Sequence, residues 1–280
     1  MADNINNSQV KTLCQIRDVY RAIYDFELNF QQDLGTGDNA GKAGYFKNVG
    51  GVATWQNPVD STLNGGSDLY VATVQGDLDF VKLEAWYAGL QETFNTYTLA
   101  ATSNLDLAEN AKLGLEARYV YLKLDSDLVG NFVERDNSMM RFAVDGKFSI
   151  VNARLAYTKT DKDGGLTAFD QDAKNTSLGW AITSNGVADA DYFQAALGVD
   201  ILDNLNFTAH YGNLSSDLQT GRAVLIDDVK QQEVYGQLTY KMSKNLSTYL
   251  RYGTYDEKIN STGEKVQDQT RGRIQVAYTF

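Results

Sequence analysis

The sequence predicts an all-β fold, a transmembrane antiparallel up-and-down β-barrel of about twelve strands preceded by an N-terminal amphipathic helix. Three observations predict it. From about residue 68 onward, apolar and polar residues alternate with the period of two that sends successive side chains to opposite faces of a strand. Full charges stand in the middle of the polar faces, while the apolar faces end repeatedly in tyrosine. Long and short connections alternate between the strands.

The first part of the chain differs in style from everything that follows. Residues 11–34 carry apolar side chains at helical spacing, and Gly35 follows as a typical helix stop. The pattern predicts an amphipathic helix of about five or six turns. We therefore expect two parts, a helix with its linker at 1–44 and the barrel at 45–280. The helix is either a plug in the lumen, a helix packed against the barrel, or a segment foreign to it.

The strand segments follow in order, each bounded by turn residues such as Gly, Asn, Asp and Ser. Within each one, apolar residues at every second position define one face and polar residues define the other. They include "DFVKLEAWYAG", "AKLGLEARYVY", "SMMRFAVDGKF", "VNARLAYTK", "NLNFTAHYGN", "QEVYGQLTYK", "NLSTYLRYGTYDE" and the closing "RGRIQVAYTF". The alternation continues to the last residue, whereas chain ends are usually frayed.

Two features of these faces favour a membrane barrel over a soluble β-sandwich. Full charges stand in mid-strand on the polar face, as Arg118 and Asp145 do. Aromatic residues at strand ends are typical of the girdle at a membrane interface, whereas a sandwich core requires Val, Ile and Leu at those depths. The tyrosines that end the apolar faces are Tyr87, Tyr119, Tyr121, Tyr157, Tyr211, Tyr240, Tyr252 and Tyr278.

The connections alternate in length when they are followed back from the C-terminus. "DEKINSTGEKVQDQT" is long and "KMSKN" is short, and "NLSSDLQTGRAVLIDDVKQQ" is long and "DILDNL" is short. The longest is "TDKDGGLTAFDQDAKNTSLGWAITSNGVADAD". All the long connections fall on one side, as in outer-membrane barrels with short periplasmic turns and long external loops. We expect each of them to be an external loop.

Composition excludes several classes of protein. No apolar run in the 280 residues approaches the roughly 18 that a membrane helix needs. The 17 Tyr and the single Pro favour many strands. A net charge of -11 argues against nucleic acid as a partner. One Cys and one His exclude the usual zinc clusters, and His210 has no neighbouring serine that would form a catalytic triad. We predict no enzyme, no catalytic residue, no metal and no cofactor.

Several of these segments resemble the campylobacterial major outer membrane porin and related Opr-type porins. They are "VKLEAWYAGLQETFNTYTLAATSNLDL", "KLGLEARYVYLKLDSDL" and "NLSTYLRYGTYDEKINS" with the closing "TRGRIQVAYTF". The resemblance covers residues 45–280 and lies in the rhythm of strands and loops. It implies conduction of small hydrophilic solutes across the outer membrane, and a homotrimer. The final "AYTF" resembles the terminal aromatic signature read by the outer-membrane assembly machinery, which assigns Tyr278 and Phe280 to an assembly signal.

The chain departs from that family in one respect. Its members are longer and have about eighteen strands, whereas the alternation here predicts about twelve. The opening "MADNINNSQVKTLCQIRD" also lacks the basic start and apolar core of a secretory signal. Two alternatives stay open, a smaller barrel and a barrel whose first strands are missing.

The polar faces supply the candidate pore-lining residues, because rings of charge set ion preference and narrow a pore. The excess of acidic residues predicts a weak cation preference, since it raises the local concentration of cations at the mouth. The side chains that we expect in the lumen are Lys82, Glu84, Glu116, Arg118, Arg141, Asp145, Arg154, His210, Glu233, Arg251 and Arg273.

The predicted function is that of an outer-membrane porin for passive diffusion of ions and small hydrophilic solutes, with outer-membrane lipid around it. Two alternatives from other classes stay open. The first is a structural or adhesive barrel with a filled lumen, since small barrels are filled by their own side chains. It predicts bilayer insertion without conductance. The second is a soluble all-β binding protein, which predicts solubility without detergent.

Overall fold

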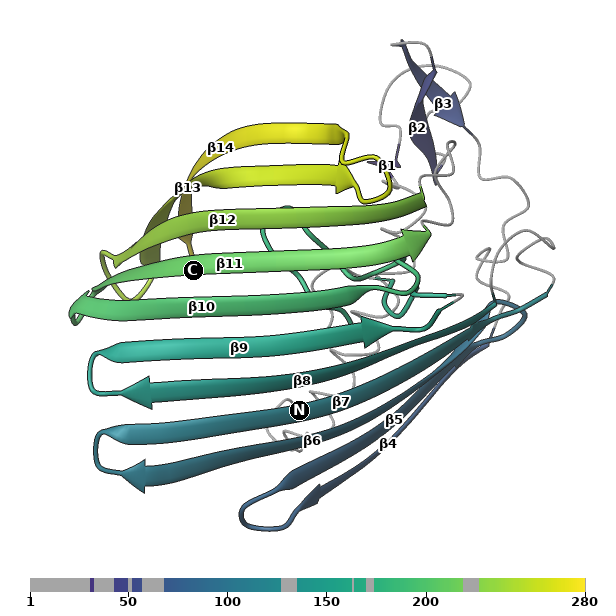
Figure 1. Ribbon diagram of the computed structural model, residues 1–280. Coiled ribbons are helices and arrows are strands. Elements are labelled where there is room, and N and C mark those ends of the chain that lie inside the picture. The colour runs from purple at the N-terminus through teal and green to yellow at the C-terminus, as the bar shows by residue number, and fades with distance from the viewer. Residues whose placement is uncertain are drawn as a thin grey trace.

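Eleven antiparallel strands form one sheet in the computed structural model, which describes residues 31–32, 43–49, 52–56, 68–126, 135–162, 164–169, 174–218 and 227–279. Every strand pairs with its neighbours in the chain, in the order β14-β13-β12-β11-β10-β9-β8-β7-β6-β5-β4, and the sheet is strongly curved (Figure 1). Its strands are β4 (Leu69–Asp77), β5 (Lys82–Leu90), β6 (Phe94–Ala108), β7 (Ala111–Leu124), β8 (Asp136–Phe148), β9 (Val151–Thr160), β10 (Asp191–Leu202), β11 (Leu205–Leu218), β12 (Asp227–Lys241), β13 (Leu246–Ile259) and β14 (Lys265–Tyr278). The predicted all-β, antiparallel, up-and-down order is confirmed.

The strand count and the N-terminal helix are not confirmed. The sheet has eleven strands in the described residues, and a separate three-stranded sheet contains β1 (Gln31–Gln32), β2 (Ala43–Val49) and β3 (Val52–Gln56). Gln31 and Gln32, placed by sequence in the last turn of the helix, pair with Gly44 and Ala43 as a strand instead. The rest of the predicted helix at 11–34 lies outside the described residues.

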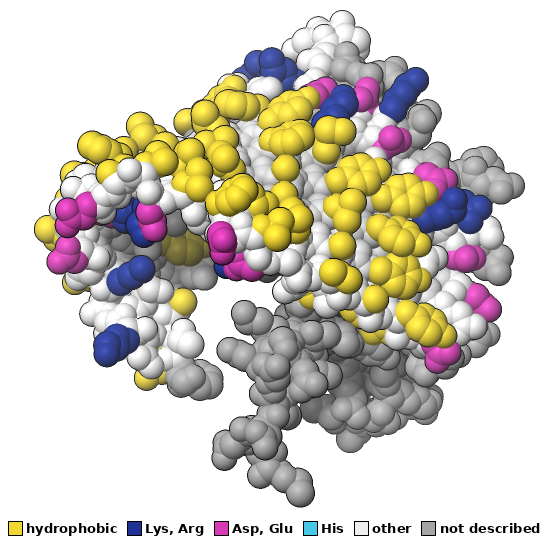
Figure 2. Space-filling model, turned by 90° about the horizontal axis from the view of Figure 1, so that it is seen from below, with side chains coloured by type: hydrophobic (Ala, Val, Ile, Leu, Met, Phe, Trp, Pro, Cys, Tyr) yellow, Lys and Arg dark blue, Asp and Glu magenta, His cyan; other side chains and the backbone are white. Residues whose placement is uncertain are grey.

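The outer, convex face of the sheet is apolar and exposed. Figure 2 shows hydrophobic side chains spread across this face, with charged side chains along its margins. A contiguous exposed surface of this kind marks a site of contact with protein or membrane. The side chains include Leu83, Leu99, Leu115, Tyr119, Phe142, Val144, Leu155, Tyr157, Leu197, Phe207, Leu238, Leu250, Tyr252, Ile274 and Val276, all of them exposed.

Two tyrosines at the end of the sheet that carries the long connections donate hydrogen bonds from their hydroxyl groups to carboxylates. The Tyr121 hydroxyl donates to Asp136, and the Tyr157 hydroxyl donates to Asp191. Each ring lies on the outer face while its polar tip contacts a carboxylate. This division between an apolar ring and a hydrogen-bonded tip suits a side chain at the boundary between lipid and water.

All the long connections lie on one side of the sheet, as the sequence predicted, but that side also carries the short connection 91–93, and several strands extend further than expected. The short turns include 149–150, where Ser149 takes a left-handed conformation with φ of 52°. The long connections at 125–135 and 161–190 lie at the opposite end of the strands. The predicted long connection between β13 and β14 is reduced to 260–264, because each of the two strands has 14 residues, more than the roughly 9–11 that cross a bilayer.

No helix in the described part of the chain is long and apolar enough to cross a membrane.

Candidate pore-lining site

The inner, concave face carries all eleven predicted pore-lining residues. Residues directly opposite each other on paired strands share a face. Arg118 lies opposite Arg141, and Asp145 lies opposite Arg154. The same registers, followed from strand to strand, connect the whole set to one face: Lys82, Glu84, Glu116, Arg118, Arg141, Asp145, Arg154, His210, Glu233, Arg251 and Arg273.

The connection between β9 and β10 folds back over this inner face. Of its described residues, 164–169 and 174–190 are called the inward segment below. Phe169 packs on Phe94 with ring centroids 4.4 Å apart. The segment forms two apolar clusters with the sheet. In the first, Leu166 and Phe169 pack against Leu90, Phe94, Leu122 and Leu124. In the second, Ile182, Val187 and Ala190 pack against Tyr192, Leu214 and Tyr255. The two clusters cover the inner face of strands on both sides of β9.

This connection therefore begins and ends on the side predicted for the external loops, but it does not extend into water as an exposed loop. Its path is decided by apolar side chains that a water-exposed loop does not need, since burying each one removes apolar surface from water. The signal was present in "GLTAF" and "LGWAI", where apolar residues interrupt an otherwise polar stretch. Alternation along the strands has no bearing on where such a connection folds.

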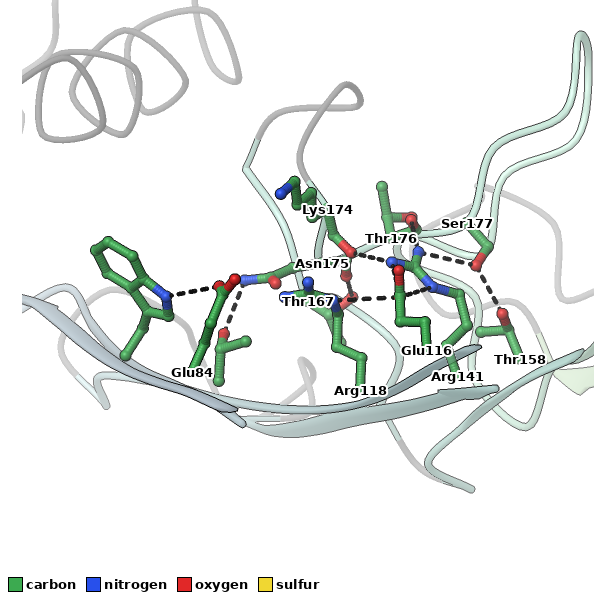
Figure 3. A network of polar contacts seen from close by, with 12 residues as sticks. Glu84, Glu116, Arg118, Arg141, Thr158, Thr167, Lys174, Asn175, Thr176 and Ser177 are labelled. Atoms are coloured by element: carbon green, nitrogen blue, oxygen red, sulfur yellow. Dashed lines mark hydrogen bonds and ion pairs between the residues drawn. The ribbon is translucent and has the colours of Figure 1, made fainter. Parts of the chain in front are cut away.

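Arg141 contacts the inward segment through its guanidinium group. Nη1 donates to the carbonyl oxygen of Thr176 at 2.7 Å, and Nη2 donates to that of Lys174 at 2.8 Å. Figure 3 shows this side chain rising from the sheet between the segment and Glu116. The neighbouring contacts continue the network, because Ser177 and Thr158 share a hydrogen bond of 2.6 Å.

The Glu116 carboxylate balances the positive charge of the Arg141 guanidinium. Its Oε1 accepts from Nε and Nη2 of Arg141 at 2.8 and 2.6 Å. Arg118 adds a longer contact of 3.4 Å from its Nε. Arg118 and Arg141 are only 6% and 7% exposed, so both cations lie beneath the segment. Buried charges require such pairing, since an unpaired one is costly to remove from water.

Glu233 contacts the inward segment from β12. Its Oε1 accepts from the backbone N–H of Trp180 at 3.0 Å, and its Oε2 accepts from that of Ala181 at 2.7 Å. The residue is 3% exposed. The backbone comes this close only because residue 179 is Gly, where a Cβ would lie 1.7 Å from Glu233 Oε1.

Arg251 lies among aromatic rings beside this contact. Its Cζ is 4.9 Å from the ring centre of Tyr235, 5.2 Å from that of Tyr249 and 5.3 Å from that of Trp180. Its Nε and Nη2 donate to Gln237 Oε1. Cation–π contacts of this kind hold the guanidinium in place. His210 stacks on Tyr235, one of these three rings, with the two ring centres 4.5 Å apart.

A hollow of about 720 Å³ lies on the inner face between β6 and β11, and His210 contributes to its lining. Asp145 and Arg154 form an ion pair of 2.6 Å within it. Asp106 and Lys112 form a second one of 3.2 Å. Such exposed pairs contribute little stability. Their charges cancel pairwise, so this part of the inner face has no large local charge.

The remaining predicted residues lie toward the edges of the sheet. Lys82 pairs with Asp77 at 3.7 Å, and Glu84 accepts from Trp86 Nε1 at 3.2 Å. Arg273 lies over the Tyr249 ring at 5.9 Å. Among the described residues, no group of three His, Cys, Asp or Glu side chains is arranged to hold a metal ion.

The predicted assembly signal is described only in part. Tyr278 is the last residue of β14, lies opposite Leu246 and is 64% exposed. Phe280 lies outside the described residues.

The comparisons with known proteins give the family from a sequence model and the fold from solved structures. A model of the family described as Campylobacter major outer membrane protein matches residues 30–280. No curated protein sequence matches the chain significantly. Among solved structures, Acinetobacter baumannii OccAB3 is 17% identical with a TM-score of 0.62, over 81% of this chain and 56% of that one.

Two Pseudomonas aeruginosa structures are similar to the same degree. OprD is 18% identical with a TM-score of 0.58, over 76% of this chain and 60% of that one. OccK1 (OpdK) is 15% identical with a TM-score of 0.59, over 75% of this chain and 55% of that one. The chain thus spans less than two thirds of the length of these structures. At such identities the similarity shows the fold.

Proposed function

The chain belongs to the family of the Campylobacter major outer membrane protein, and on this premise we propose that it is a porin for passive diffusion of ions and small hydrophilic solutes. The family places the protein in the cell outer membrane, which contradicts the alternative of a soluble all-β binding protein. The proposed mechanism is diffusion along a polar inner face, without a catalytic step.

One observation carries the proposal, the opposite chemistry of the two faces of the sheet. The outer face exposes residues such as Leu155 and Ile274, while the inner face carries Arg154 and Arg273 on the same strands. Lipid-facing and lumen-facing residues alternate in this way in outer-membrane barrels. A protein in water has no reason to expose the apolar face and turn the charged one inward.

Protein refolded in detergent and added to a planar lipid bilayer is expected to give discrete, ohmic conductance steps. Steady steps require both a closed wall and an open polar path. Far-ultraviolet circular dichroism and heat-modifiable electrophoretic mobility serve as controls for folding. Folded, inserted protein that gives no conductance, either whole or as a chain beginning at Gly44, contradicts the porin proposal.

The proposal includes a weak preference for cations. The net charge of -11 supports it, because an excess of acidic groups concentrates cations at the mouth of a pore. Arg273 opposes it locally, since among the described residues no carboxylate forms an ion pair with its guanidinium.

The reversal potential in a potassium chloride gradient is expected to have the sign of a weakly cation-selective pore. Arg273→Gln is expected to raise the potassium-to-chloride permeability ratio further, because it removes a cation from the inner face. Anion preference in the unmodified protein contradicts the proposed selectivity and leaves conduction itself intact.

A second candidate function is a structural or adhesive barrel with a filled lumen. The inward segment favours it, because the segment packs against the inner face on two sides and buries Arg118, Arg141 and Glu233. Stable bilayer insertion with no conductance supports this candidate.

Three finer parts of the proposal rest on the sequence. Three copies form a homotrimer, Tyr278 and Phe280 form the signal for the assembly machinery, and residues 1–44 are a part separate from the barrel, either a plug, a segment packed against the barrel or a segment foreign to it. If the whole protein is silent in the bilayer while a chain beginning at Gly44 conducts, residues before Gly44 close the pore.

A further inference from the structure

Three of the predicted pore-lining side chains, Arg118, Arg141 and Glu233, are almost completely buried. A buried charge needs partners, and two of these residues find theirs in the backbone of the inward segment. Arg141 and Glu233 therefore contact the segment at positions where water and solutes do not reach them.

The two contacts have opposite polarity. The Arg141 guanidinium donates to backbone carbonyl oxygens of Lys174 and Thr176. The Glu233 carboxylate accepts from backbone N–H groups of Trp180 and Ala181. Charge-assisted hydrogen bonds of this kind are about twice as strong as neutral ones. The segment forms no regular ladder of backbone hydrogen bonds. Each contact therefore gives hydrogen-bond partners to backbone groups that need them when they are buried.

The two contacts lie far apart in the sheet, on β8 and β12. The segment also contacts the strands between them. Ser177 shares a hydrogen bond with Thr158 of β9, and Gln194 of β10 donates to the carbonyl oxygen of Leu178 at 2.8 Å. Residues 174–181 thus cross the inner face from β8 to β12, with a hydrogen bond to four of the five strands.

We propose that Arg141 and Glu233 are positioning residues that hold residues 174–181 as a fixed crosspiece over the inner face. The inference rests on the proposed porin function. In this arrangement the crosspiece sets the width of the open path and does not open and close it. A channel with both contacts conducts steadily, whereas in a channel that has lost one contact the end of the crosspiece at that contact moves.

Glu233→Gln is the first test. A glutamine retains one acceptor oxygen, but its NH₂ group faces the second backbone N–H, so one hydrogen bond is lost and two donors oppose each other. Single-channel recordings are expected to show closures about ten-fold more frequent than in the unmodified protein, because a buried donor is left without its acceptor.

Asp145→Asn is the matched control. It removes the same charge from the same face, but Asp145 pairs with Arg154 in the hollow. Both variants are expected to shift the reversal potential, and only Glu233→Gln is expected to raise the frequency of closures. Equal closure frequencies in the two variants overturn the proposal.

A reversible lock gives a second test, and its first readout, the lock alone, needs no change at Glu233. Thr158→Cys with Ser177→Cys, in a Cys14→Ser background, replaces two side chains whose oxygens are 2.6 Å apart. The oxidised pair is expected to conduct as steadily as the unmodified protein, also when combined with Glu233→Gln, and reduction is expected to restore the closures of that variant. If the oxidised lock alone abolishes or changes the conductance steps, the crosspiece moves during normal conduction and the proposal is wrong. If the unmodified protein does not conduct, the porin function fails instead.

Discussion

Replacing Arg141 by methionine is expected to lower the free energy of unfolding by about 3–5 kcal/mol. Methionine has a similar length but no donors, so Glu116 and two backbone carbonyl groups lose the hydrogen bonds that Arg141 gives them. Removing one partner of a buried ion pair leaves the other charge uncompensated in a medium that solvates it poorly. The measurement is a denaturant titration of protein refolded into lipid vesicles, followed by tryptophan fluorescence.

Arg154→Met is the control for this experiment. Arg154 pairs with Asp145 at a similar distance, but both side chains of that pair are exposed to water. Its loss is expected to cost about 0–1 kcal/mol. If the two substitutions lower the free energy of unfolding equally, burial under the inward segment does not increase the contribution of the Arg141 contacts to stability.

Replacing Leu155 by arginine is expected to destabilise the protein by about 2–4 kcal/mol in a lipid bilayer. Leu155 lies in the middle of β9 and is 53% exposed on the outer face. In hydrocarbon the new charge has neither water nor a partner, whereas the same change on a face bathed in water costs almost nothing. The same vesicle titration measures it.

Asn152→Arg on the same strand is the matched control. Asn152 lies on the inner face and lines the hollow, where water solvates a cation. The substitution is expected to change the free energy of unfolding by less than about 1 kcal/mol. A cost for Leu155→Arg no larger than this shows that the outer face does not meet lipid.

The faces of the strands were predictable from the sequence. In β9, Leu155 and Tyr157 alternate with Arg154 and Thr158, and the structure keeps this alternation. The pattern is local, because the pleat of a strand sends each side chain to the face opposite its neighbour. The placement of all eleven charged and polar candidates on one face follows from that geometry.

The partners of those side chains were not predictable in the same way. Arg141 and Arg154 look alike in the sequence, since each stands in mid-strand on the polar face. One is 7% exposed and holds backbone carbonyl groups, and the other forms an ion pair in the open hollow. The difference comes from Lys174 and Thr176, which lie 33 and 35 residues further along the chain and which periodicity does not connect with Arg141.

Four features follow from the amino-acid sequence alone: the antiparallel order of the strands, the apolar outer face, the charged inner face and the side on which the long connections lie. These features depend on spacing along the chain and on the short turns that join neighbours. The inward path of the connection between β9 and β10, and its contacts with Arg141 and Glu233, are visible only in the folded chain. This path depends on contacts between distant residues, because apolar burial and backbone hydrogen bonds outweigh the polar composition of the connection.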